Sequence, residues 1–142
     1  MATIVEVIES LVTAIEAVAV TEPVSEDDRF RVAVGGDAAA ISRGSRVVLL
    51  GATCPQPVKP GRTCTDYETT ITLAVTYANA ERSGTYLRAL LDSEVLAAAI
   101  LLWGGTATDV LSAVQTGEDV TPNGDGWLIA SRSIIVQYSR GA

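Results

Sequence analysis

The sequence contains no histidine, and its 142 residues include only two cysteines, Cys54 and Cys64. Without histidine, neither a Ser-His-Asp triad nor a Cys-His pair can form, and no metal site can use imidazole ligands. A closed zinc site needs more nitrogen and sulfur ligands than two cysteines supply. We therefore expect that the protein is not an enzyme and has no metal and no cofactor.

Basic residues and long hydrophobic runs are also scarce. Ten Lys and Arg stand against 17 Asp and Glu, a formal net charge of −7, which disfavours binding of nucleic acid through its phosphates. The longest apolar run, residues 95–103, is far shorter than the ~20 residues of a membrane-spanning helix. The N-terminus lacks the positive charge of a signal peptide. We expect a soluble protein made in a reducing cytoplasm, where free thiols are favoured over a Cys54–Cys64 bridge.

Apolar residues are plentiful although aromatic ones are few. They make up 48% of the chain, with only 5% aromatics and a mean hydropathy of +0.31, so Val, Ala, Leu and Ile must fill the core. The length suits one domain over residues 1–142. This composition leaves apolar surface to spare, which favours self-association.

Two helices are predicted. Residues 2–20 carry apolar side chains at three- and four-residue spacing, which indicates an amphipathic helix. Residues 85–103 predict a second helix that is apolar over a wide arc, so we expect a sheet on one side of it and a neighbouring subunit on the other. The Asp92-Ser93 pair is a candidate interruption, and Gly104-Gly105 would end this helix.

Strand patterns and turn signals fill the rest of the chain. Residues 67–77 alternate most clearly, and a proline-rich segment, 53–64, predicts an exposed loop. The element order is α-β-β-β-α-β-β, which indicates an α+β fold with a mixed or antiparallel sheet packed by both helices. The five predicted strands are 29–35, 46–52, 67–77, 110–116 and 127–140.

Charge is distributed unevenly along the chain. Residues 1–28 carry only acidic charge, a net −7, whereas residues 29–64 carry a net +5. These blocks are either solvated faces or the two sides of a head-to-tail contact between subunits, in which opposite charges fix the register. The candidate subunit-interface charges are Glu6, Glu9, Glu16, Arg43, Arg46, Lys59 and Arg62.

A family resemblance rests on the element order, the size, the acidity and two segments, YETTITLAVTYAN (67–79) and SRSIIVQYSRG (131–141). In these features the chain resembles tail terminator proteins of long-tailed, siphovirus-like bacteriophages. The resemblance covers nearly the whole chain. It implies a structural virion protein, assembled in the host cytoplasm, that forms a ring, typically a hexamer. Its implied partners are other copies of itself, the major tail tube protein and the head-tail connector protein, and DNA would pass through the lumen without specific binding.

Two alternatives remain open from the residues. A head–tail connector or other neck protein of the same particle would share the size and the ring. A cytoplasmic small-ligand binding domain would instead be a monomer with a deep apolar pocket. No catalytic, cofactor-binding or metal-binding residue is carried over from the resemblance.

Overall fold

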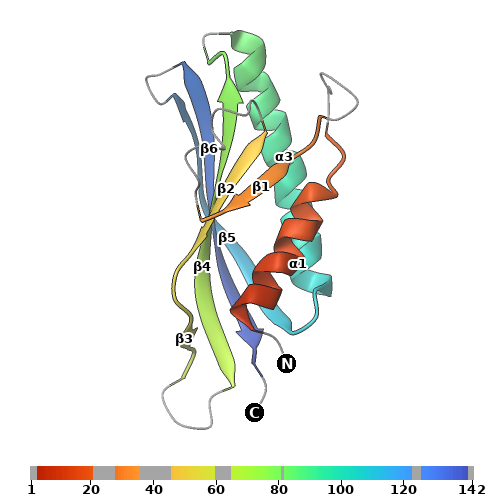
Figure 1. The fold of residues 1–142 in the computed structure, drawn as a ribbon, viewed down its shortest axis with the longest axis vertical. Helices are drawn as coiled ribbons and strands as arrows, with labels where there is room; N and C mark the ends of the chain where they lie inside the picture. The colour runs from red at the N-terminus through yellow and green to blue at the C-terminus, as the bar shows by residue number, and fades with distance from the viewer. Residues whose placement is uncertain are drawn as a thin grey trace.

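The computed structural model describes residues 3–20, 28–35, 46–59, 65–80, 82–122 and 126–140. These residues form two helices and six strands, which confirm the predicted α+β class and element order, with one short strand, β3, added (Figure 1). In chain order they are α1 (Ile4–Glu16), β1 (Arg31–Val34), β2 (Val47–Ala52), β3 (Gln56–Pro57), β4 (Asp66–Ala78), α3 (Ser83–Thr106), β5 (Val110–Pro122) and β6 (Trp127–Ser139).

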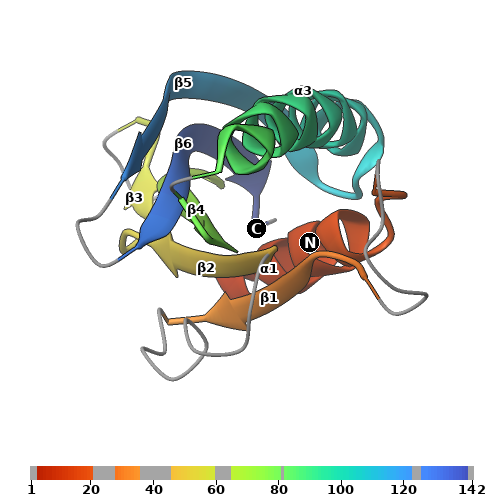
Figure 2. The same ribbon diagram turned by 90° about the horizontal axis from the view of Figure 1, so that it is seen from above.

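The strands form one mixed sheet in the order β1-β2-β4-β6-β5, with β3 paired to one end of β4. Among the described strands only the β1–β2 pair is parallel, and the other pairs are antiparallel. The central pair, β4 and β6, stays in register from Asp66 opposite Ser139 to Ala78 opposite Trp127. Figure 2 shows the sheet curving around both helices, which lie on the same side of it.

The core lies between the concave face of the sheet and the helices. The predicted alternation of β4 is confirmed, because Ile71, Leu73 and Val75 are buried there while Thr72 is exposed. Alternate residues of β6 face the same way, since Ile134 is opposite Ile71 and is also buried. Period-two burial on one face is what a strand needs when helices cover only that face.

Helix α1 is shorter than the sequence predicts. Thr3 caps its start by accepting a hydrogen bond from the Glu6 amide at 3.2 Å, and the helix ends at Glu16 rather than at residue 20. It packs against β1 and α3. The indole Nε1 of Trp103 in α3 donates to Ser10 Oγ in α1 at 2.9 Å, which ties the two helices together.

Helix α3 runs past both predicted breakpoints. Asp92 and Ser93 do not interrupt it, and Gly104-Gly105 do not end it, because the helix continues to Thr106. A Cβ added to Gly104 would lie 2.8 Å from the Cβ of Ala113 in β5. This glycine therefore permits close packing of α3 on β5 instead of supplying a left-handed helix end.

Two strand predictions also need correction. The last hairpin is longer than expected, because β5 continues to Pro122 through a register shift beside Gly117, whose φ is +65°. Within the predicted exposed loop 53–64, Gln56 and Pro57 form β3 against β4. Residues 60–64 of that loop lie outside the described residues.

Candidate functional site

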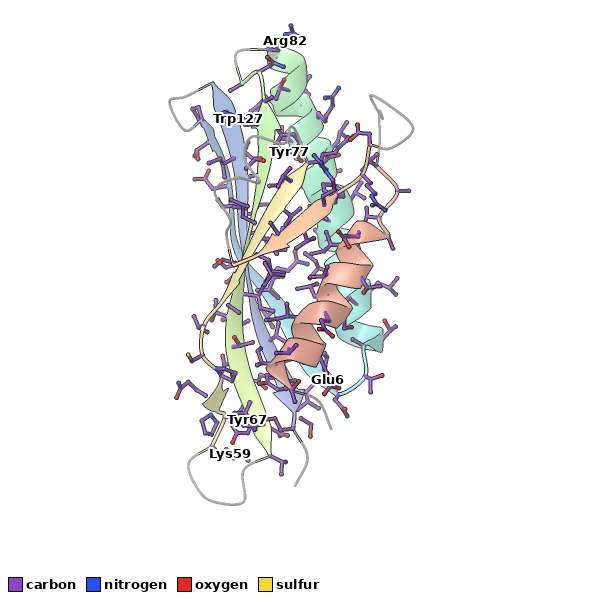
Figure 3. The ribbon with its side chains drawn as sticks, viewed as in Figure 1. Glu6, Lys59, Tyr67, Tyr77, Arg82 and Trp127 are labelled. Carbon is purple, nitrogen blue, oxygen red and sulfur yellow. The ribbon has the colours of Figure 1, made fainter. Side chains whose placement is uncertain are left out.

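The five candidate interface charges within the described residues do not form one surface. Glu6 and Glu9 are exposed on α1, and Lys59 is exposed just beyond β3. Figure 3 places Glu6 and Lys59 toward the same end of the elongated molecule, on different elements. Arg43 and Arg62 lie outside the described residues.

Glu16, the last residue of α1, also contacts the outer edge of the sheet. It is half-buried, and its Oε2 accepts a hydrogen bond of 3.3 Å from the backbone N–H of Val32 in the edge strand β1. A carboxylate on an edge amide occupies a donor that another strand would otherwise pair with. Glu16 thus limits the use of β1 for strand-to-strand pairing.

Arg46 is a correction to the sequence interpretation, because it is fully buried and cannot be an exposed interface charge. Its Nε and Nη2 donate to the two carboxylate oxygens of Asp92 at 2.8 and 3.0 Å. Its Nη1 donates to Asp28 Oδ2 at 2.7 Å. The forked geometry of a guanidinium suits such a two-point contact. Arg46 joins β2, the chain before β1 and the middle of α3.

Tyr77 completes this buried cluster from β4. Its hydroxyl donates to Asp92 Oδ2 at 2.8 Å. Burial and the charge of Asp92 raise the pKa of Tyr77 well above its ordinary value. Burial alone would lower the pKa of Arg46, but the hydrogen bond and charge of Asp92, with the charge of Asp28, raise it. The cluster therefore holds a neutral tyrosine and a charged arginine inside the protein.

The backbone at Arg46 is unusual as well. Its φ is +62°, a left-handed conformation that a long side chain adopts at a cost of about 1 kcal/mol or more. Its backbone N–H donates to the Thr76 carbonyl at 2.8 Å, and its own carbonyl accepts from Arg31 N at 3.1 Å. The side-chain cluster and these two bonds hold the residue in place.

A second buried arginine meets the next residue of α3. Arg132 in β6 donates through Nη2 to the carbonyl and the Oγ of Ser93, at 2.8 and 2.7 Å. The Arg132 guanidinium also contacts Gln115 Oε1 and pairs with Glu118 Oε1 at 3.0 Å, both in β5. Burial lowers the pKa of Arg132, and the charge of Glu118 opposes that effect. The polar pair in α3 thus anchors the helix to the sheet.

The opposite face of α3 is apolar and exposed. Leu101, Leu102 and Leu87 keep 69%, 67% and 60% of their surface, and Leu90 and Leu91 are also exposed. At about 100° per residue these side chains lie within one stripe along the helix, with Glu94 as the one exposed charge of α3. We call this surface the outer stripe of α3. The expected cover by the sheet on one side of this helix is confirmed by its contacts with β4, β5 and β6. The expected cover of the other side by a neighbouring subunit stays a prediction.

The strand beside α3, β5, also has exposed apolar side chains. β5 is an edge strand, with exposed Leu111 and Val114 toward its start and exposed Glu118 and Asp119 toward its end. The outer stripe and β5 together form a flank that is apolar with acidic charges. We call it the α3–β5 flank.

A groove of about 400 Å³ runs between α1 and α3. Apolar side chains line most of it, and Trp103 forms part of its wall. It is open rather than enclosed, so it offers a contact surface more than a chamber. Its lining residues are Ala14, Ala17, Val18, Val95, Ala99, Leu102, Trp103 and Thr106.

An aromatic and cationic contact lies at the Tyr67 end of β4. Tyr67 and Tyr138 lie with ring centroids 6.3 Å apart, and the Arg140 guanidinium lies 4.7 Å from the centre of the Tyr67 ring. Stacking of this kind closes the end of a core. Tyr77, by contrast, is buried deep in the Arg46 cluster, so the two tyrosines that share a face of β4 have different roles.

Within the described ranges no group of three or more Cys, Asp or Glu side chains is placed to hold a metal ion. No helix among the same residues is both long and apolar enough to cross a membrane. No protein-family model and no curated protein matches this sequence. Function must therefore be argued from the surfaces of the chain itself.

Proposed function

We propose that this chain is a tail terminator of a long-tailed bacteriophage, a structural virion protein whose copies form a ring on the end of the tail tube. The outer stripe of α3 carries the proposal. Exposed leucines along a helix this long are costly in water and are typical of a surface that another protein covers. Assembly into a ring, of the hexameric kind that the resemblance implies, would cover it.

The resemblance lends separate support from the centre of the sheet. Its two segments, 67–79 and 131–141, fall largely on β4 and β6, the fully paired centre of the sheet. The proposed ring stops polymerisation of the tube protein and joins the tail to the head connector protein. DNA would pass through its lumen without specific binding, in keeping with the net charge of −7.

Deletion of the gene in the virus that encodes it tests this function. Tails are expected to be overlong and unjoined to heads, because nothing ends the growing tube. Electron microscopy of the lysate measures tail length directly. Tails of normal length would contradict the proposal, and tails of normal length that still fail to join heads would favour a head–tail connector.

The groove between α1 and α3 favours a second candidate, a small-ligand binding domain. Its mostly apolar wall would take an apolar molecule. A chain that stays monomeric at high concentration and binds an apolar fluorescent probe would support this candidate. Loss of probe binding in Ala99→Glu, with binding kept in Glu9→Gln, would place the probe in the groove.

A further inference from the structure

We propose that the α3–β5 flank of one copy binds the β1 edge of a second copy, so that the chain assembles head to tail. The proposal rests on the proposed function in one respect, which is that the copies assemble into a closed ring. It assigns the contact to the outer stripe of α3 on one side and to Arg29, Arg31 and Val34 on the other.

The first argument is apolar surface on both sides. The outer stripe follows a helix of 24 residues, about 36 Å long, and is broken by the single exposed charge of Glu94. On the β1 edge, Val34 keeps 58% of its surface. Apolar surface on each side gains from mutual burial.

The second argument is charge. Within residues 83–122 the exposed charged residues are Glu94, Glu118 and Asp119, all acidic. Within residues 28–35 they are Arg29 and Arg31, both basic. Two α3–β5 flanks that met each other would bring like charges together, whereas an α3–β5 flank and a β1 edge attract. The second copy therefore presents its β1 edge.

The third argument is position. β1 and β5 are the two ends of the strand order, and Figure 2 shows them on opposite sides of the molecule. A contact between opposite sides leaves one of each free, so it repeats in one direction and closes into a ring when the rotation allows. Since Glu16 occupies the Val32 amide, side chains rather than new strand pairs make this contact.

Charge reversal tests the assignment. Arg29→Glu and Glu94→Arg should each weaken assembly about tenfold or more, because each places like charges across the contact. The double variant Arg29→Glu/Glu94→Arg should recover most of the loss, because its two sides are again opposite. Sedimentation velocity over a concentration series measures this, with circular dichroism to show that each variant is folded.

Lys59→Glu is the matched control. Lys59 is an exposed cation beyond β3, outside both proposed sides, so its reversal should leave assembly unchanged. Loss of assembly in Lys59→Glu but not in Arg29→Glu would overturn the proposal. So would full assembly of Arg29→Glu together with loss in Glu94→Arg, because the α3–β5 flank would then bind a surface other than the β1 edge.

Failure of this contact and failure of the proposed function give different results. A wild-type chain that stays monomeric overturns the contact, and the tail length of the deletion mutant still decides the function. A chain that assembles through these two sides, from a virus whose deletion mutant makes normal tails, keeps the contact and loses the terminator. The two measurements are independent.

Discussion

The two faces of α3 differ from those of an ordinary surface helix, because polar residues are buried on one face and leucines are exposed on the other. Its inner face buries Asp92 and Ser93 against two arginines from the sheet, whereas its outer face exposes five leucines. Helix α1 shows the ordinary pattern, with Val7, Leu11 and Ile15 buried and its glutamates at or near the surface. Two helices on the same side of one sheet thus bury apolar residues alike but expose different kinds of side chain.

This difference indicates which contacts stabilise each helix and which surface each helix leaves exposed to other proteins. Helix α1 is held by burial of an apolar stripe, and Val5 is its one large apolar side chain that is exposed. Helix α3 is held by polar contacts as well, so fewer of its leucines are needed inside. The leucines on its outer stripe remain for a partner to cover.

The largest expected effect is on the inner face of α3. Asp92→Asn removes the charge that faces Arg46 and keeps the ion pair of that buried guanidinium with Asp28. The unfolding free energy should fall by about 3 kcal/mol or more. Chemical denaturation measures it. Glu94→Gln, two residues away on the outer stripe, is the control and should leave stability unchanged; equal losses in the two variants would refute the contrast between faces.

The neighbouring glycines offer a second pair across the same helix. Gly104→Ala should destabilise by about 1–3 kcal/mol, because its new Cβ would press on Ala113. Gly105→Ala meets nothing within 4 Å and should stabilise the helix by about 0.5–1 kcal/mol. Thermal melts of both variants would show shifts of opposite sign. Two stabilising substitutions would mean that α3 and β5 are less tightly packed than the structure has them.

Local pattern was enough to predict much of this fold. The alternation of β4 and the apolar periodicity of α1 each lie within one segment, so neither depends on distant residues. The burial of Arg46 could not be predicted in that way, because Asp92 and Asp28 lie 46 and 18 residues from it. An arginine before a strand looks the same whether it faces water or a carboxylate.

The middle of α3 carries a sequence signal with two possible meanings. Asp92-Ser93 in an otherwise apolar helix indicates either a break or a buried polar anchor, and only the partners on β2 and β6 decide between them. Gly104 was ambiguous for a related reason. A glycine near a helix end supplies either a turn or a close approach, and Ala113 of β5 decides it.

A smaller effect, and one that depends on pH, is expected at Tyr77. Tyr77→Phe removes the hydrogen bond to Asp92 and should cost about 1–2 kcal/mol near neutral pH. The raised pKa of Tyr77 means that the unfolded chain loses this proton first. Wild-type stability should therefore fall as pH rises above about 10.

The unfolding free energy of Tyr77→Phe should decline less steeply than that of the wild type over the same alkaline range. Denaturation at several pH values measures both. Some decline would persist, because burial also raises the pKa of Tyr138. An identical slope in Tyr77→Phe and the wild type would show that Tyr77 does not carry the alkaline sensitivity.

The smallest expected effect on folding is at the outer stripe, and it separates the two faces most sharply. Leu101→Ser changes a side chain that keeps 69% of its surface, so the unfolding free energy of the monomer should change by no more than about 0.5 kcal/mol. Leu96→Ala, one and a half turns away on the inner face, removes a side chain that is 3% exposed and should cost about 2–4 kcal/mol. Denaturation at concentrations below assembly gives both values. If Leu101→Ser also lost several kcal/mol there, the stripe would belong to the core of the single chain, and no partner would be needed to explain its leucines.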